Sequence, residues 1–301
     1  TARYGPPHGH LVSGGLLATL ISPHREQPRS LVLGANGPAV CGIPYGPRQL
    51  GAGGRRPSRP AVPRARLVPH PSRLDIHMRY AVLGTGIVGR TVAARLASLG
   101  HEVVIGTRDP RATLDRAEYA EWQEAHPSIG LAAFPEAARH GETLVNATGG
   151  RVSVEALTEA DAAHLQGKVL IDIANPLDFS QGFPPRLDPV DDDSLGELIQ
   201  RTFPQLRVVK TLNTMNCQIM VDPARVPGEH SVFLSGDDAD AKKAVHDLLA
   251  SFGWPDGSII DLGGIETARG TEMLLPLWLR LMKALGHTDF NFHIQTARPS
   301  S

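Results

Sequence analysis

The sequence predicts an α/β fold of the Rossmann type, a doubly wound, mainly parallel sheet with a C-terminal helical extension. Residues 80–83 form a continuous apolar run, as a parallel strand buried on both faces requires. Glycines at GxGxxG spacing follow at once, then an amphipathic helix pattern and a second apolar run at residues 103–105. Strand, turn, helix and strand therefore arrive in the order of a dinucleotide-binding unit.

Each glycine of this turn has a physical task. Gly84 permits the tight turn, Gly86 lets a pyrophosphate approach the backbone, and Gly89 lets the helix pack closely on the strand. The free amides at the start of the helix then hold the phosphates. A lone GxGxxG is weak evidence, because glycine-rich turns arise wherever backbones crowd, but the flanking elements here favour a nucleotide site.

The end of the second strand predicts which dinucleotide binds. An NAD enzyme places Asp or Glu there to accept hydrogen bonds from the ribose, whereas this chain has Gly106-Thr107-Arg108. An arginine beside a hydroxyl residue suits the 2′-phosphate of NADP. Thr85 and Arg111 lie near enough in sequence to assist. The alternative is an ordinary exposed loop arginine.

Composition divides the 301-residue chain at Met78. Residues 1–77 hold 10 Arg, no Lys and two acids, for a net charge of +8, with 12 Pro and 11 Gly, whereas residues 78–301 carry −9. We expect the first segment to be disordered. A translation start assigned too far upstream is the favoured interpretation, with a functional tail or a targeting segment as alternatives. The remainder divides into an NADP-binding part, residues 78–216, and a C-terminal part, residues 217–301, that completes the sheet.

Cysteine usage and hydropathy limit the setting. Cys41 and Cys217 show no metal or disulfide spacing, which fits a reducing cytoplasm. Residues 11–21 are too short and too rich in glycine to span a membrane. We expect no metal site, because the aspartates at 191–193 have no second acidic cluster, and no nucleic-acid partner.

Further apolar runs continue the sheet. We expect strands at residues 143–145, 169–173, 207–209, 232–234 and 259–262, with a helix between the last two that Asp237 caps and Gly253 ends. Residues 267–286 form a last helix, bent or started at Pro276, that is apolar nearly all round and is expected to be buried. If its own sheet covers it only partly, we expect a homodimer.

Ligands of such sheets bind beyond the carboxyl ends of the strands. Small and amide residues dominate the three segments at those ends, 146–150, 174–176 and 211–216. They permit close approach of a flat nicotinamide and a few directed hydrogen bonds. The alternative is that they are ordinary turn residues. The candidates from these segments are Asn146, Ala147, Thr148 and Asn175.

These motifs together resemble the family of NADP-dependent reductases of the deazaflavin coenzyme F420 and its NADP-binding relatives. The likeness covers Met78 to about Phe292 and rests on GTGIVG, GTR, IDIANP, VVKTLNTM, VFLSGDD and DLGGIETARG. By this resemblance, one group would hold the adenine-side phosphates and another would border the nicotinamide and the second ring system. The first group is Thr85, Ile87, Val88, Thr107 and Arg108, and the second is Ala147, Asn175 and Asn213.

The resemblance implies direct hydride transfer between NADPH and a second redox cofactor, a deazaflavin or a flavin. The sequence has no Tyr-x-x-x-Lys proton-donor motif, in keeping with this. The alternatives are a reductase of ketones, imines or hydroxyacids and a noncatalytic NADP-sensing module. Asn213 and Lys210 are weak catalytic candidates, the lysine as the acid of a hydroxyacid dehydrogenase.

Overall fold

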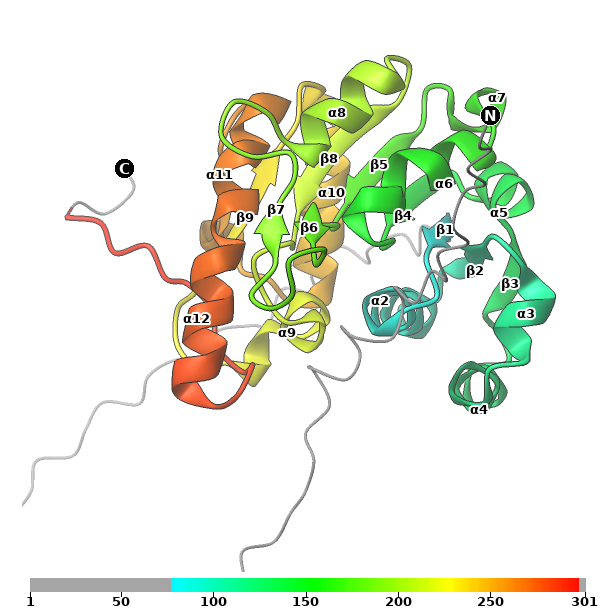
Figure 1. Cartoon of the computed structure of the whole chain (residues 1–301), viewed down its shortest axis with the longest axis horizontal. Coiled ribbons are helices and arrows are strands. Elements are labelled where there is room, and N and C mark those ends of the chain that lie inside the picture. The colour runs from blue at the N-terminus through cyan, green and yellow to red at the C-terminus, as the bar shows by residue number, and fades with distance from the viewer. Residues whose placement is uncertain (1–76, 298–301) are drawn as a thin grey trace, which may run out of the picture. The chain divides into compact units, whose positions relative to one another are not determined.

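An eight-stranded sheet forms the centre of the computed structural model, which describes residues 77–297. The predicted tail up to residue 76, with Cys41, lies outside the described residues. The strand order is β10-β9-β8-β5-β4-β1-β2-β3. Six strands from β3 to β8 along this row are parallel, whereas β9 pairs antiparallel with β8 and β10 pairs parallel with β9. The predicted mainly parallel, doubly wound fold is confirmed (Figure 1).

The strands of the large sheet are β1 (Arg79–Leu83), β2 (Glu102–Thr107), β3 (Gly130–Ala133), β4 (Thr143–Asn146), β5 (Val169–Asp172), β8 (Arg207–Thr211), β9 (Val232–Ser235) and β10 (Ile259–Asp261). The helices are α2 (Ile87–Ser98), α3 (Pro110–Leu114), α4 (Ala117–Ala125), α5 (Phe134–His140), α6 (Ser153–Glu159), α7 (Ala162–Leu165), α8 (Leu195–Thr202), α9 (Cys217–Val221), α10 (Ala239–Phe252), α11 (Ala268–Met273) and α12 (Leu275–Leu285).

Helices cover both faces of the sheet and enclose two apolar cores. One core joins α2, α9 and α10 to the strands, with Leu96 and Val245 fully buried. The other joins α5, α6 and α8, with Leu157 and Ile199 fully buried. The first core crosses the expected boundary at residue 216, because β8 and β9 are neighbours in one sheet.

The sheet contains one strand that the sequence analysis missed, and one cap lies elsewhere. β3 reads Gly-Leu-Ala-Ala, which lacks the β-branched and aromatic residues typical of strands. Helix α10 is capped by Asp238, whose carboxylate accepts from Ala241 N at 2.7 Å, and not by Asp237 as expected. Asp237 instead accepts from the backbone of Ile265 at 2.8 Å. Gly253 ends α10 with a left-handed φ of 108°, as predicted.

The C-terminal helical region differs from the expectation in two ways. It divides at Leu274 into α11 and α12, with Pro276 in the first turn of α12. The prediction of a fully buried helix is wrong, because only one side of α12 is covered. Trp278 is buried and stacks on Phe290, with ring centroids 5.4 Å apart, whereas Leu277 remains 49% exposed.

Candidate functional site

The glycine turn after β1 has the crowding pattern that the sequence predicted. Gly84 has a φ of +118°, and a Cβ there would lie 2.5 Å from the carbonyl oxygen of Ala147. A Cβ on Gly89 would collide with the carbonyl oxygen of Gly84. A Cβ on Gly86 would meet nothing within 4 Å. Gly84 and Gly89 are therefore required by packing, and Gly86 leaves an open approach to the backbone.

That approach leads to the free amino end of α2. Gly86 is the residue before the helix, and no side chain caps it. The first turn contains no acidic residue, and Ile87 and Val88 are its first two residues. The first amides of a helix lack partners within the helix and attract anions. The turn and the helix start therefore fit the diphosphate of a dinucleotide.

At the end of β2, the two predicted residues have different environments. Thr107 is buried, and its hydroxyl lies 2.9 Å from the hydroxyl of Thr113. Arg108 has an exposed side chain that donates to Glu155 at 3.1 Å and to Glu159 at 3.3 Å. Arg108 is therefore an accessible cation at the end of β2, and two carboxylates of α6 form ion pairs with it.

A second arginine, which the sequence analysis missed, lies beside the glycine turn. Arg116 Nη2 donates to Thr85 Oγ1 at 2.7 Å. Arg111, which was predicted to assist, is exposed. Because Arg116 follows a short helix that begins after Arg108, its return toward Thr85 depends on the turn between α3 and α4. Its one signal in the sequence is its position directly before the residues of α4, and that signal does not indicate a contact with Thr85.

The segments that follow β1, β4, β5 and β8 contact one another in the spatial order of these strands, at the carboxyl ends of the strands. The loop after β4 lies against Gly84 through Ala147, and a Cβ on Gly150 would collide with the backbone of Asn175 after β5. Asn175 Nδ2 in turn donates to the carbonyl oxygen of Asn213 after β8 at 2.8 Å, and Asn213 Nδ2 donates to Asn175 Oδ1 at 3.0 Å. The structure therefore places the predicted Ala147, Asn175 and Asn213 on segments that contact one another in a row, and it brings Asn175 and Asn213 into direct contact.

The side chain of Asn146 faces inward. It is fully buried and donates to Asp172 at 2.8 Å and to Ser153 at 3.0 Å. Thr148 Oγ1 donates to Asn146 Oδ1 at 2.7 Å. These bonds hold the loop after β4 in place, so we infer that Asn146 shapes the site and that the Thr148 hydroxyl serves the same network.

Backbone strain marks the turn that carries Asn213. Leu212 has a φ of +62°, a left-handed conformation that a branched side chain rarely adopts, and it is buried. Such strained residues persist only where the surroundings enforce them, and they cluster at functional sites. The turn after β8 is therefore held in one geometry that places Asn213 against Asn175.

Comparison with known proteins identifies relatives of this arrangement. The family model of NADP oxidoreductases, coenzyme F420-dependent, matches residues 79–176. The F420-dependent NADP reductase of Methanothermobacter marburgensis is 31% identical over 213 residues, which span 68% of this chain and 92% of that protein. The chain belongs to the family of coenzyme F420-dependent NADP oxidoreductases. It is thus an NADP-dependent oxidoreductase by family.

Two further proteins resemble this F420-dependent family member, with different identities and over different shares of their lengths. A solved structure from Arthrobacter sp. FB24, described as a candidate F420-dependent NADP reductase, is 61% identical with a TM-score of 0.71. It covers 73% of this chain, and the chain covers all of it. Metalloreductase STEAP3 of Rattus norvegicus is 28% identical over 204 residues, which make up 66% of this chain and 38% of that protein. The likeness to STEAP3 thus concerns well under half of its length.

In this NADP oxidoreductase, Lys210 lies in a buried charge cluster. Its ammonium group donates to Asp172 at 2.9 Å and to Ala174 O at 2.5 Å, and it lies 2.7 Å from Glu272. Burial by itself lowers the pKa of Lys210, but the two carboxylates outweigh it and raise that pKa above 10.5. All three ammonium protons have acceptors, so we infer a structural role in place of the proton-donor role considered from the sequence.

Glu272 extends this cluster to another part of the reductase. Its carboxylate accepts from the backbone amides of Leu195 and Gly196 at 2.9 and 3.2 Å. These amides begin α8, whose positive end stabilises a negative charge. The cluster therefore joins α11 to the sheet and to α8.

Cys217 and two further arginines, Arg151 and Arg269, have local partners. Burial raises the pKa of the Cys217 thiol, which disfavours the nucleophilic thiolate. Arg151 pairs with Asp178, and Arg269 pairs with Glu197 at 2.5 Å. Both guanidinium groups are therefore partly neutralised by carboxylates.

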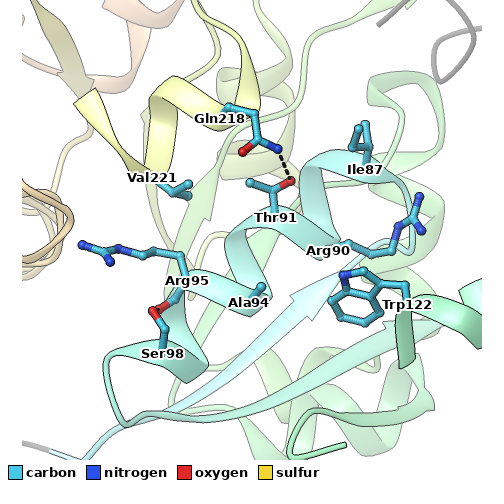
Figure 2. Close-up of a pocket in the computed structure, with 9 residues that line it drawn as sticks. All are labelled: Ile87, Arg90, Thr91, Ala94, Arg95, Ser98, Trp122, Gln218 and Val221. Atoms are coloured by element: carbon cyan, nitrogen blue, oxygen red, sulfur yellow. Dashed lines mark hydrogen bonds between the residues drawn. The ribbon is translucent and has the colours of Figure 1, made fainter. Parts of the chain in front are cut away.

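A groove of about 500 Å³ runs beside α2, next to the glycine turn (Figure 2). Trp122 of α4 borders one side and Gln218 of α9 the other, where Gln218 Nε2 donates to Thr91 Oγ1 at 3.5 Å. Arg95 also lines the groove and donates to the carbonyl oxygens of Ser251 and Phe252.

Within residues 77–297, no helix is long and apolar enough to cross a membrane.

Proposed function

We propose that this oxidoreductase transfers a hydride between NADPH and coenzyme F420. The observation that carries the proposal is the row of contacts at the sheet edge, from the glycine turn through Ala147 and Asn175 to Asn213. It lies at the carboxyl ends of adjacent parallel strands, where such sheets bind ligands. The Methanothermobacter marburgensis relative is named as an F420-dependent NADP reductase, which supports the same pair here.

The residues of the row have distinct tasks in this proposal. Gly86 and the start of α2 bind the diphosphate, and Arg108 binds the 2′-phosphate. Ala147 offers a small side chain beside the nicotinamide. Asn175 and Asn213 fix each other, and each amide group has a second N–H that their mutual bonds do not use.

The bound nucleotide supplies the hydride, and the protein supplies position and polarity. The buried Lys210 is not needed as an acid in this scheme. A reductase of hydroxyacids would need such a donor in contact with substrate, and the ammonium group of Lys210 instead faces Asp172 and Glu272. The geometry therefore favours transfer between two ring cofactors.

The proposal is tested by mixing the full chain with NADPH and oxidised F420 and following the nicotinamide absorbance. We expect loss of that absorbance only when F420 is present. A parallel panel contains free flavin, a ferric chelate, a cyclic imine and a ketone. Turnover with a panel compound and none with F420 would contradict the proposal, and tight NADPH binding without any turnover would support a noncatalytic sensing module.

Site variants connect this activity to the amide pair. Asn213→Ala and Asn175→Ala should each slow F420 reduction while leaving NADPH affinity within about threefold, because they border the nicotinamide and not the phosphates. Gln205→Ala is a matched amide control, since Gln205 is exposed at the other end of β8. Unchanged rates in both asparagine variants would show that Asn175 and Asn213 are not part of the site.

We further propose that the protein is a homodimer and is cytoplasmic. The exposed side of α11 and α12 supports the first proposal, because Met273, Leu277 and Leu285 lie at four- and eight-residue spacing and are 41, 49 and 50% exposed. Light scattering on the full chain measures the oligomeric state, and a monomer at micromolar concentration would contradict the dimer. The cytoplasmic location stays a prediction from cysteine usage.

A further inference from the structure

We propose that Arg116 is a second cation for the 2′-phosphate of NADP, acting with Arg108. This inference rests on the proposed function, because it assumes that NADP lies along the glycine turn. Arg116 stands directly before α4 and reaches the turn across the surface, where Nη2 donates to Thr85 Oγ1 at 2.7 Å. Thr85 lies between Gly84 and Gly86, so the guanidinium group is next to the nucleotide path.

The positions of the strand ends place Arg116 at the adenine ribose. The β1 and β2 strands are parallel neighbours, and Gly84 N donates to the carbonyl oxygen of Gly106 at 2.9 Å. Thr85 therefore stands beside the end of β2, where the ribose 2′ position of a bound dinucleotide is recognised. From the end of β2, the side chain of Arg108 extends toward α6, where it pairs with Glu155 and Glu159. The side chain of Arg116 extends from the start of α4 toward Thr85.

Charge distinguishes the two arginines. Arg108 lies within 3.3 Å of carboxylate oxygens on both Glu155 and Glu159. Over residues 77–297, no carboxylate lies within ion-pair distance of Arg116. A phosphate monoester carries a charge of about −1.5 to −2 at neutral pH, more than Arg108 alone neutralises while two glutamates compete for it. Arg116 supplies a positive charge that no carboxylate of the described residues shares.

The neighbours of Arg116 fix the position of its guanidinium group and leave most of its N–H groups free to bind an anion. The group lies over the ring of Tyr119, with 5.7 Å between its central carbon and the ring centroid. Thr85 accepts one of its five N–H groups, which leaves the others for phosphate oxygens. The Thr85 hydroxyl keeps its own proton for the same anion. A guanidinium group fixed in this way loses less freedom on binding than an unattached one.

Calorimetric titration with NADPH and NADH tests the inference on the full chain. The proteins are wild type, Arg108→Ala, Arg116→Ala, Arg116→Lys and the control Arg139→Ala, which removes an exposed charge at the end of α5. We expect Arg116→Ala to weaken NADPH by about 10- to 100-fold and NADH by less than about twofold, since NADH lacks the phosphate. Arg116→Lys should retain part of the difference, and Arg139→Ala should match wild type.

The outcomes separate this inference from the proposed function. If Arg108→Ala loses the preference for NADPH and Arg116→Ala keeps it, the inference is wrong and the proposed function stands. Equal weakening of both nucleotides by Arg116→Ala would assign Arg116 to the adenine or ribose and would also overturn it. If wild type binds neither nucleotide, the proposed function itself fails. Thermal unfolding without nucleotide checks that each variant is folded.

Discussion

Arg108 and Glu155 form an ion pair of 3.1 Å across the surface between β2 and α6. Glu159 joins it at 3.3 Å, and the side chains of all three residues are at least one-third exposed. Binding of a 2′-phosphate by Arg108 must compete with these carboxylates. In the proposed function, the residue that recognises the 2′-phosphate is therefore paired with two carboxylates that oppose its ligand.

The first prediction concerns this competition. Glu155→Gln with Glu159→Gln should strengthen NADPH binding by about two- to tenfold and leave NADH unchanged, because each exposed pair is worth at most about 1 kcal/mol. Isothermal titration with both nucleotides measures the change. Glu121→Gln with Glu124→Gln removes the same charge from exposed positions of α4 and serves as the control. Equal strengthening in the two double variants would show that the effect comes from net charge and not from competition for Arg108.

The second prediction separates the glycines of the turn. Gly86→Ala should leave the free energy of unfolding within about 0.5 kcal/mol, since its φ of −70° suits any residue and its Cβ has open space. The added methyl group should weaken NADPH and NADH alike by about tenfold or more, because it meets the diphosphate. Urea unfolding and nucleotide titration measure the two effects.

Gly89→Ala is the counterpart of that variant. Its Cβ would collide with the carbonyl oxygen of Gly84, so it should lower the free energy of unfolding by about 1–3 kcal/mol or more. If Gly89→Ala were as stable as wild type, or if Gly86→Ala bound both nucleotides normally, the assignment of roles within the turn would be wrong.

The third prediction concerns the buried cluster of Lys210, Asp172 and Glu272. Lys210→Met leaves two buried carboxylates without their shared cation and should lower the free energy of unfolding by about 3–5 kcal/mol. Adding Asp172→Asn and Glu272→Gln should restore part of this loss. Lys283→Met, at an exposed position of α12, is the control. A stable, active Lys210→Met protein would contradict the structural role.

The fourth prediction is a loss of stability in acid. The hydrogen bond from Arg269 lowers the pKa of Glu197 below 4.5, and the hydrogen bond from Arg201 lowers the pKa of Asp193 below 3.8. Both carboxylates therefore stabilise the fold above these ordinary values, and the stabilisation is lost as pH falls through their lowered pKa values. Urea unfolding between pH 7 and about pH 3 measures this loss. Glu197→Gln should make the decline shallower, and an unchanged slope would contradict it.

The sequence predicted the parts of the fold that depend on local pattern. Continuous apolar runs located seven strands of the large sheet, and the glycine spacing located the turn before α2. It missed β3, whose Gly-Leu-Ala-Ala pairs with β2 at the end of the sheet but carries no local strand pattern. It also overestimated the burial of the last helix, because an apolar sequence does not reveal which face has a neighbour.

The site was predicted more closely where its residues follow strands. The ends of parallel strands meet at one edge, which is why Asn175 and Asn213 could be grouped before their contact was known. Arg116 could not be found in this way, since its approach to Thr85 depends on the tertiary path of α3 and α4. The burial of Lys210 was equally hidden, because Glu272, one of its partners, lies 62 residues further along the chain.

The central claim is that Arg108 recognises the 2′-phosphate of a dinucleotide whose diphosphate lies on the turn at Gly86. Titration of wild type and Arg108→Glu with NADPH and NADH tests it most directly. We expect wild type to prefer NADPH, and the variant to lose NADPH affinity by at least about 100-fold while NADH changes little. A wild-type protein that binds both nucleotides equally, or a variant that weakens both to the same extent, would contradict the claim.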